Sequence, residues 1–284
     1  MEYLNGKNLQ KNFLNDIKNE VFLLGIKPTL AIISIDDNKV NNLFIRQIKK
    51  MCNYVGYEYI HYHYEDISED TLYNLIQKLN NDSKITSILL VQPLLKHLQT
   101  FKIRNAILAN KDVDGINDFS RINFFNGEGG FLPATVLGIK FLLEGYNINI
   151  NKKNVVIVNR NEFIGKILFD YFLINDCTVT IAHSKTKNLE YYLKNADIVV
   201  TAIGKANSFK VNLFKDDSVI IDIGIDCDNN TYYGDIEIID TNNSKVAYLA
   251  KSIGGVGPMT IAALAYNILR SYYLTQEDTK NKVF

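Results

Sequence analysis

Four short segments carry polar or glycine-rich sequence directly after an apolar stretch, and these are the places where chemistry could occur. They are VQPL at residues 91–94, KDVDG at 111–115, VNRNEFIG at 158–165 and GGVGPMT at 254–260. Loops that follow parallel strands meet at one crevice, where α/β proteins bind their ligands. Singly, each segment has a structural explanation, because an aspartate pair beside glycine is typical of a turn and GGVGP of a flexible entry into a helix. Together they predict one ligand site assembled from several loops.

The elements that must position these loops show the pattern of βαβ units. Short apolar segments alternate with longer amphipathic stretches, which indicates a mainly parallel sheet. We predict strands at residues 29–35, 58–62, 86–92, 154–158, 178–182, 197–202 and 218–223. We predict helices at 41–55, 69–79 with Ser68 as N-cap, 136–146, 162–173 and 259–274 with Pro258 at its favoured first position. The second half of the chain is typical of a nucleotide-binding Rossmann fold.

Composition favours a small molecule as the partner. The 284 residues include 31 basic and 31 acidic side chains, so the protein lacks the net positive charge expected of a nucleic-acid or anionic-membrane binder. The three cysteines form no CxxC pair, which argues against a disulfide framework and favours a reducing cytoplasm. No run of about 18 apolar residues suggests a membrane span. We expect His61, His63 and His97 to be strand or surface residues, with no metal site.

The four segments, in this order and spacing, resemble the methylenetetrahydrofolate dehydrogenase/cyclohydrolase family. The resemblance extends from about Gly25 to the last helix and includes HSKTKNL at 183–189, ADIVVTAIGK at 196–205, VIIDIGI at 219–225 and Gly234-Asp235. It implies an α/β fold with two domains. These are an N-terminal folate-binding domain at 1–140 and 260–284, and a Rossmann-type NADP-binding domain with a mainly parallel sheet at 141–259. It also implies a cytosolic homodimer that uses tetrahydrofolate one-carbon derivatives, with a place in purine biosynthesis.

On the folate side, the resemblance implies that Asp114 anchors the pterin ring and that Gln92 supports a catalytic lysine. When the chain is aligned on residues 55–57, however, Phe44 occupies the position of the family tyrosine and Ile48 that of the lysine. Lys49 and Lys50 follow directly, but an offset of one residue rotates a side chain by about 100° around a helix. We therefore expect both lysines to be solvated. The implied substrate-binding residues are Phe44, Gln92, Asp114, Gly255 and Pro258.

On the cofactor side, the family pattern G-R-S-x-x-x-G appears as NRNEFIG. Asn159 tolerates a left-handed backbone, and Gly165 allows close packing of a helix on a strand. Arg160, Ser184 and Lys185 offer positive charge and a hydroxyl group to the second phosphate of NADP, so NADP is favoured over NAD. The implied cofactor-binding residues are Asn159, Arg160, Asn161, Gly165, Ser184, Lys185, Gly224 and Ile225.

These residues suit the hydride transfer of this family better than its hydrolysis step. Hydride transfer from a methylene bridge requires positioning and electrostatics but no proton movement. Hydrolysis of the methenyl product requires a general acid/base, which Phe44 and Ile48 cannot supply. We therefore predict an NADP-dependent methylenetetrahydrofolate dehydrogenase, and we leave its cyclohydrolase activity open because the family tyrosine and lysine are replaced. Two alternatives remain open: a catalytically degenerate paralogue that binds folate or nucleotide, and a different Rossmann dehydrogenase, such as one that acts on shikimate.

Overall fold

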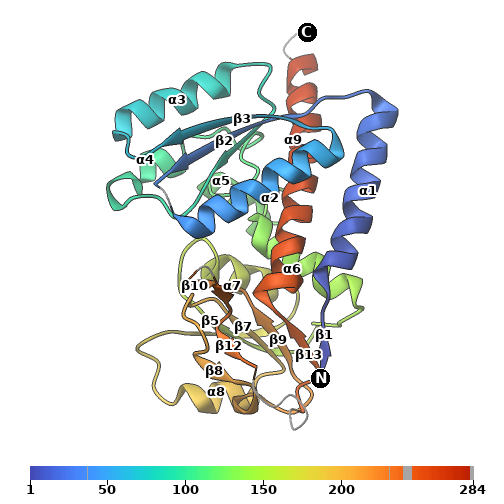
Figure 1. Cartoon of the computed structure of the whole chain (residues 1–284), viewed down its shortest axis with the longest axis vertical. Helices are drawn as coiled ribbons and strands as arrows, with labels where there is room; N and C mark the ends of the chain where they lie inside the picture. Colours follow the sequence, from blue (N-terminus) through green and yellow to red (C-terminus); the bar gives the residue numbers. More distant parts are fainter. Residues whose placement is uncertain (37, 230, 239–244, 282–284) are drawn as a thin grey trace. The chain divides into compact units, whose positions relative to one another are not determined.

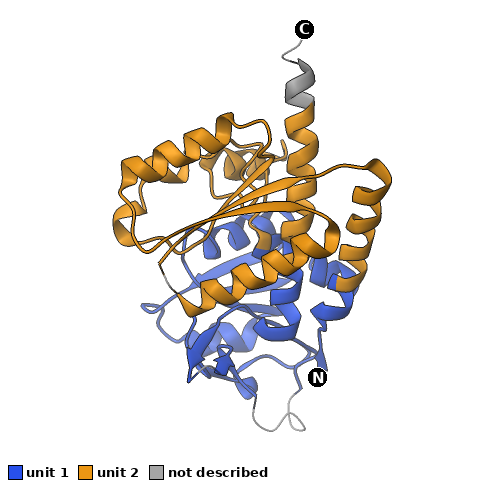
Figure 2. Ribbon diagram, turned by 45° about the horizontal axis from the view of Figure 1, so that its top comes forward, with its two compact units in different colours: residues 1–10, 135–260 blue, residues 11–134, 261–284 orange. Residues whose placement is uncertain are grey.

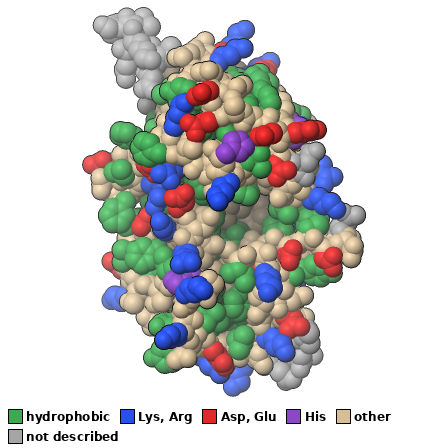
Figure 3. Space-filling model, turned by 90° about the vertical axis from the view of Figure 1, so that its left-hand side faces the viewer, with side chains coloured by type: hydrophobic (Ala, Val, Ile, Leu, Met, Phe, Trp, Pro, Cys, Tyr) green, Lys and Arg blue, Asp and Glu red, His purple; other side chains and the backbone are tan. Residues whose placement is uncertain are grey.

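The computed structural model describes residues 1–36, 38–229, 231–238 and 245–281, and the chain divides into two compact units. Unit 1 comprises Met1–Gln10 and Thr135–Thr260, and unit 2 comprises Lys11–Ala134 and Ile261–Phe284 (Figure 2). Each unit contains a parallel sheet with helices, so the predicted α/β class is confirmed. The chain has equal numbers of basic and acidic residues, and both kinds are interspersed on the face shown in Figure 3.

Unit 2 is built on a three-stranded parallel sheet in the order β3-β2-β4 (Figure 1). The central strand is buried along its whole length, which explains its unbroken apolar sequence. The elements of this unit are β2 (Thr29–Ile35), α2 (Lys39–Val55), β3 (Glu58–Tyr64), α3 (Glu69–Asn81), β4 (Ser87–Leu90), η1 (Lys96–Leu98), α4 (Phe101–Arg104), α5 (Asp118–Phe125), most of α1 (Gly6–Leu24) and most of α9 (Gly257–Asn281).

Local capping decides where the helices of unit 2 begin and end. The side chain of Asn38 accepts hydrogen bonds from the backbone N–H groups of Val40 and Asn41, so α2 begins two residues before the predicted start. Gly56 ends this helix with φ at 89°, a left-handed conformation that suits glycine. Ser68 caps α3 by accepting from the N–H of Thr71, as predicted.

The C-terminal helix α9 is held in unit 2 by buried side chains. The amide of Asn267 donates to the carbonyl oxygens of Val113 and Leu132, at 2.8 and 3.0 Å. The hydroxyl of Ser271 lies 2.6 Å from the carbonyl oxygen of Thr86. By length and composition the helix Ser252–Gln276 could cross a membrane, but 72% of its apolar window is buried inside the protein, as in a core helix.

Unit 1 contains a six-stranded, all-parallel sheet in the order β1-β13-β9-β7-β5-β6. Apolar side chains from β5, β7, β9 and β13 form one core cluster that includes Val156, Val199, Ile220 and Leu249. The elements of this unit are β1 (Glu2–Tyr3), α6 (Ala134–Gly145), β5 (Asn154–Val158), α7 (Gly165–Ile174), β6 (Thr178–Ala182), α8 (Leu189–Asn195), β7 (Ile198–Thr201), β8 (Phe209–Lys210), η2 (Val211–Leu213), β9 (Val219–Asp222), β10 (Asp226–Asp228), β11 (Thr231–Tyr233), β12 (Ile236–Glu237), β13 (Tyr248–Ala250) and η4 (Ser252–Val256).

The compact units differ from the predicted division at the N-terminus. Strand β1 pairs with β13, with Glu2 opposite Tyr248, and residues 1–10 belong to unit 1. The division also falls between Ala134 and Thr135, at the start of α6, instead of at residue 140. Gly138 of this helix packs closely against the first turn of α9, because a Cβ at Gly138 would lie 2.7 Å from the carbonyl carbon of Met259.

Candidate active site

The KDVDG segment extends the sheet of unit 2 and places Asp114 at the carboxyl ends of its strands. Asp112 forms a parallel bridge with Ile88 of β4, and the N–H of Ile88 donates to the carbonyl oxygen of Lys111 at 2.7 Å. Gln92, which is half-buried, comes two residues after the end of β4. Gln92 and Asp114 therefore both follow the carboxyl ends of neighbouring parallel segments, where ligands bind in this type of sheet.

The carboxylate of Asp114 has a fixed direction. Its Oδ1 accepts a hydrogen bond of 2.8 Å from the backbone N–H of Ala134. Gly115 has φ at 58°, and a Cβ there would lie 2.2 Å from the carbonyl oxygen of Phe131, so no side chain fits beside Asp114. Burial raises the pKa of Asp114 to about 6. At neutral pH this group is an ionised hydrogen-bond acceptor.

Lys111 and Asp112, in contrast, are structural. The ammonium group of Lys111 is buried and donates to the carbonyl oxygens of Leu79, Asn80 and Asp82 at the end of α3. The dipole of α3 also stabilises a cation at this C-terminal end. Burial raises the pKa of Asp112 to about 7. The motif thus contains two residues that build the loop, and Asp114, whose carboxylate is held by the N–H of Ala134.

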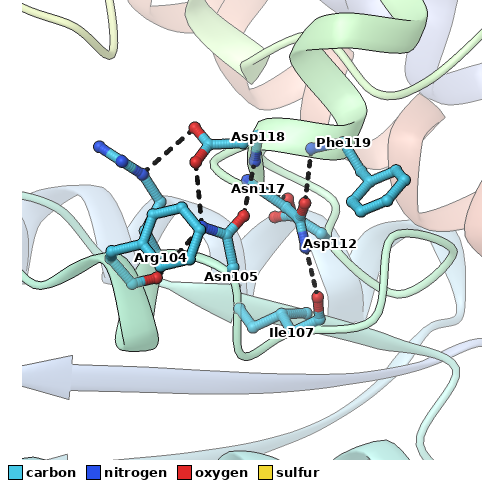
Figure 4. A network of polar contacts seen from close by, with 8 residues as sticks. Arg104, Asn105, Ile107, Asp112, Asn117, Asp118 and Phe119 are labelled. Carbon is cyan, nitrogen blue, oxygen red and sulfur yellow. Dashed lines mark hydrogen bonds and ion pairs between the residues drawn. The ribbon is translucent and has the colours of Figure 1, made fainter.

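A polar network next to Asp112 shapes the rest of this loop (Figure 4). Oδ2 of Asp112 accepts from the backbone N–H of Asn117 at 2.7 Å, and the side chain of Asn117 caps α5 through the N–H of Phe119. Beside it, the guanidinium of Arg104 forms an ion pair of 3.2 Å with Asp118. These contacts hold the segment that follows Asp114 without using the Asp114 carboxylate.

The two positions where the resemblance implies a tyrosine and a lysine carry only hydrocarbon. Phe44 is half-buried and Ile48 is fully buried, and both belong to α2 with a spacing of four residues. Neither side chain can accept or donate a proton. The neighbouring Lys50 is exposed, as predicted, but Lys49 is half-buried.

Lys49 belongs to a hydrogen-bonded chain that the sequence did not predict. Its ammonium nitrogen lies 3.0 Å from Nδ1 of His61. Nε2 of His61 lies 2.8 Å from Oγ of Ser34, and Nδ1 of His63 lies 3.0 Å from the same oxygen. Because an ammonium group only donates, His61 accepts at Nδ1, donates from Nε2 to Ser34, and is neutral. Lys49 is therefore not solvated as expected, whereas His61 and His63 lie on strand β3, as expected.

The electrostatics of His61 agree with this arrangement. Burial lowers its pKa, and the positive charge of Lys49 lowers it further. His97 lies elsewhere and is 3.2 Å from the carbonyl oxygen of Ile67. Among the residues that the structure describes, no group of three or more His, Cys, Asp or Glu side chains is arranged to hold a metal ion.

In unit 1, asparagine side chains shape the loop after β5. The amide of Asn159 donates to the carbonyl oxygen of Ala202, which follows β7, and its Oδ1 accepts from the N–H of Asn161 at 2.6 Å. Asn161 in turn accepts from the N–H of Phe163 at 2.6 Å. These turns delay the start of α7 to Gly165, instead of the predicted residue 162. A Cβ at Gly165 would lie 2.5 Å from the carbonyl oxygen of Asn159, so glycine is required there.

The predicted phosphate-binding side chains are exposed at the carboxyl ends of β5 and β6. Arg160, Ser184 and Lys185 are all accessible. His183 and Thr186 close the second loop, because the N–H of His183 donates to Oγ1 of Thr186 at 2.8 Å. A rigid turn thus presents Ser184 and Lys185. This loop contains no acidic residue that would repel a phosphate group.

The loop after β9 contains Gly224, which is buried, and Ile225, which is partly exposed. The carbonyl oxygen of Gly224 accepts a hydrogen bond from the hydroxyl of Ser252. A Cβ at Gly224 would lie 2.0 Å from Oδ1 of Asp235, so the backbone approaches this carboxylate very closely. Ser252 and Asp235 were not predicted as site residues, although Gly234-Asp235 was one of the matching segments.

Gly255 is also buried in unit 1, and Pro258 lies in the first turn of α9, one residue after its first residue. Gly255 packs against the N-terminal segment, because a Cβ at Gly6 would lie 1.9 Å from the Gly255 carbonyl oxygen. Gly254 has φ at 90°. The glycines of GGVGP therefore serve close backbone packing and a left-handed turn, which a flexible lead into a helix does not explain.

The chain is similar to known proteins along nearly its whole length. Models described as the catalytic domain and the NAD(P)-binding domain of tetrahydrofolate dehydrogenase/cyclohydrolase match residues 4–114 and 133–276. The bifunctional protein FolD of Campylobacter hominis is 37% identical over 276 residues, covering 95% of this chain and 97% of that protein. The FolD protein of Agathobacter rectalis is 38% identical over 273 residues, covering 94% and 98%. A crystal structure of the bifunctional enzyme FolD from Campylobacter jejuni has a TM-score of 0.89 at 32% identity, covering 96% and 99%.

Proposed function

The chain belongs to the tetrahydrofolate dehydrogenase/cyclohydrolase family, and from this premise we propose that it oxidises 5,10-methylenetetrahydrofolate to 5,10-methenyltetrahydrofolate with NADP. Unit 2 would bind the folate and unit 1 the dinucleotide. The proposal depends on one observation: a fixed, ionisable Asp114 carboxylate occurs together with the uncharged Phe44 and Ile48. The binding group is retained, whereas the groups for proton transfer are missing.

The folate side of the proposal assigns binding roles to three residues. Asp114 accepts hydrogen bonds from nitrogen donors of the pterin ring, and the N–H of Ala134 keeps its carboxylate in the required direction. Gln92 offers its amide to the same ligand. Phe44 supplies an apolar surface for the ring system. Hydride transfer requires these groups only to hold the substrate in a reactive geometry.

The dinucleotide side assigns the loop after β5 to the pyrophosphate. Asn159, Asn161 and Gly165 support the proposal because their hydrogen bonds and close packing pre-form the loop. NADP, when bound, supplies the hydride acceptor. Gly224 and Ile225 would contact the nicotinamide end of the cofactor, and Gly255 and Pro258 would contact the folate.

NADP is preferred over NAD in this proposal because of charge. Arg160 and Lys185 are exposed cations that can pair with a 2′-phosphate, and Ser184 adds a hydroxyl donor. An NAD-binding site of this fold usually has an acidic residue near the ribose hydroxyl, and the loop of residues 183–186 has none.

The proposal excludes effective hydrolysis of the methenyl product. Water would have to be activated and the tetrahedral adduct broken by a general acid/base, which contributes about 10²–10⁴ in rate. Ile48 provides no such group, and the amine of Lys49 is hydrogen-bonded to His61. We also propose that the protein works in the cytoplasm and that it is a homodimer. Light scattering of the purified protein would test the homodimer by its molar mass.

Two assays test the function separately. In the first, NADP reduction is followed by absorbance with methylenetetrahydrofolate as substrate, and turnover is expected. In the second, the decay of methenyltetrahydrofolate is compared with and without protein, and no acceleration is expected. Rapid hydrolysis would contradict the argument from Ile48. Calorimetric binding of folate and NADP without turnover would instead identify the protein as a non-catalytic paralogue.

A further inference from the structure

Asp235 is a buried carboxylate of unit 1 that the proposed chemistry does not use. Its side chain is not exposed. Oδ2 accepts a hydrogen bond of 2.7 Å from the N–H of Ile203, and Oδ1 accepts one of 3.0 Å from the N–H of Lys205. Both donors belong to residues 203–205, which we call the β7 loop because it follows strand β7. The carboxylate therefore determines the path of this loop.

The same carboxylate also contacts the loop after β9. A Cβ at Gly224 would lie 2.0 Å from Oδ1 of Asp235, so the carboxylate occupies the space that any larger residue at position 224 would need. Gly224 is one of the residues proposed to meet the nicotinamide end. Asp235 thus connects two neighbouring loops at the carboxyl ends of β7 and β9, which is where Rossmann folds bind dinucleotides.

Asp235 is itself held in place by the last residue of strand β9. Its backbone N–H donates to Oδ1 of Asp222, the last residue of β9, at 3.1 Å. The N–H of Ile236 donates to Oδ2 of Asp222 at 3.1 Å. Asp222 is also buried, with 3% of its surface exposed. The backbone at Asp235 is therefore anchored to the end of strand β9, which fixes the position of the Asp235 carboxylate.

From these contacts we infer that Asp235 is a positioning residue for the dinucleotide, which sets the separation between the β7 loop and Gly224. This inference rests on the proposed function. Because both carboxylate oxygens accept backbone N–H groups, Asp235 acts through the loops and does not transfer a proton. Loss of the acceptor would leave the N–H groups of Ile203 and Lys205 without this partner and let the β7 loop move. A displacement of about 1 Å at a binding loop can reduce the rate about 10²-fold.

The test compares Asp235→Asn with a matched control, Asp197→Asn. Asp197 precedes β7, so it lies at the amino end of the same sheet, where it accepts from the N–H of Asn154 at 2.8 Å and pairs with Lys215 at 2.6 Å. Both variants remove a charged acceptor of a backbone N–H within unit 1. They differ in the edge of the sheet that they affect.

The measurements are calorimetric Kd values for NADP and steady-state KM and kcat for NADP and for methylenetetrahydrofolate. We expect Asp235→Asn to raise the Kd and KM for NADP at least about tenfold, with the folate KM changed less than about twofold. Asp197→Asn should change neither KM. Gly224→Ala, which pushes on the same carboxylate, should reproduce the effect of Asp235→Asn and keeps the test valid if that variant does not fold.

The outcomes separate the inference from the proposed function. If the wild-type protein binds NADP and Asp235→Asn and Gly224→Ala bind it equally well, the inference is wrong and the function stands. An equal rise of the NADP and folate KM values, or the same effect in Asp197→Asn, would show only a general loss of structure and would also overturn the inference. If the wild-type protein does not bind NADP, both are overturned.

Discussion

The ammonium nitrogen of Lys49, on helix α2, lies 3.0 Å from Nδ1 of His61, on strand β3. Residues 48 and 49 point in directions that differ by about 100° around helix α2. Ile48 therefore occupies the position where the resemblance implies a lysine, while the amine of the adjacent Lys49 is hydrogen-bonded to His61. Proximity in the sequence does not make Lys49 a substitute.

Removal of Lys49 should change the titration of His61. The positive charge of Lys49 lowers the pKa of His61, in addition to the larger effect of burial. Lys49→Met should therefore raise this pKa, which NMR titration of the imidazole ring protons measures directly. Lys50→Met, which removes an exposed neighbouring charge, is the control and should leave the titration nearly unchanged. An unchanged His61 titration in Lys49→Met would contradict the hydrogen-bonded chain.

Restoring the two missing groups should create hydrolysis. The double variant Phe44→Tyr, Ile48→Lys places an amine four residues after a phenol on the same face of α2. We expect the decay of methenyltetrahydrofolate to accelerate about tenfold or more, because a general acid/base contributes about 10²–10⁴ when well placed. Hydride transfer should stay within about tenfold of the wild-type rate.

The control for this gain is Phe44→Tyr, Ile48→Met, which has a side chain of similar length without the amine. Faster hydrolysis in the lysine variant alone would assign the effect to the amine. Equal rates in the two variants, with both proteins folded by circular dichroism, would show that the site differs from the one inferred here.

The affinity for folate should depend on pH through Asp114. Burial raises its pKa from 3.8 to about 6 in the folded protein. The ionised form is the one that accepts pterin N–H groups, so kcat/KM for the folate should fall as the pH decreases below about 6, and stay level above it. The value should fall by up to about tenfold for each further pH unit, since kcat/KM reports the ionisation of the free enzyme.

Asp114→Asn should lower folate kcat/KM and remove this pH dependence. The matched control is Asp118→Asn, in the same segment, whose carboxylate pairs with Arg104. It should retain the wild-type pH profile. A profile that persists in Asp114→Asn would assign the ionisation to another group.

The preference for NADP should depend on Arg160 and Lys185. Replacing either residue by alanine should raise the KM for NADP about tenfold, because a charge-assisted hydrogen bond contributes about 1.5–3 kcal/mol and exposure reduces this. The KM for NAD should not change. Lys187→Ala, which removes another exposed lysine of the same segment, is the control. Parallel rises in the two KM values would argue against a 2′-phosphate site.

Much of the fold follows from local sequence patterns. The limits of β2, β5 and β6 agree with the predicted ranges. β2 and β5 are apolar runs buried in parallel sheets, whereas β6 is a partly exposed edge strand in which threonine alternates with apolar residues. Helix α1 was missed because it has no acidic residue in its first turn, although Leu14, Ile17 and Val21 recur at helical spacing and are buried. Strand β1 was also missed: two residues reveal no period, and only their pairing with β13 makes them a strand.

The sequence by itself determined the α/β class, the family, and the absence of ionisable groups at Phe44 and Ile48, because each of these depends on residue types and spacing along the chain. Only the tertiary structure decided which members of a motif are structural: Lys111 caps α3, whereas Asp114 is held by Ala134. It also decided the partners of Lys49 and Asp235. Hydrogen bonds between residues distant in sequence depend on distances of about 3 Å that arise only when strands and helices pack.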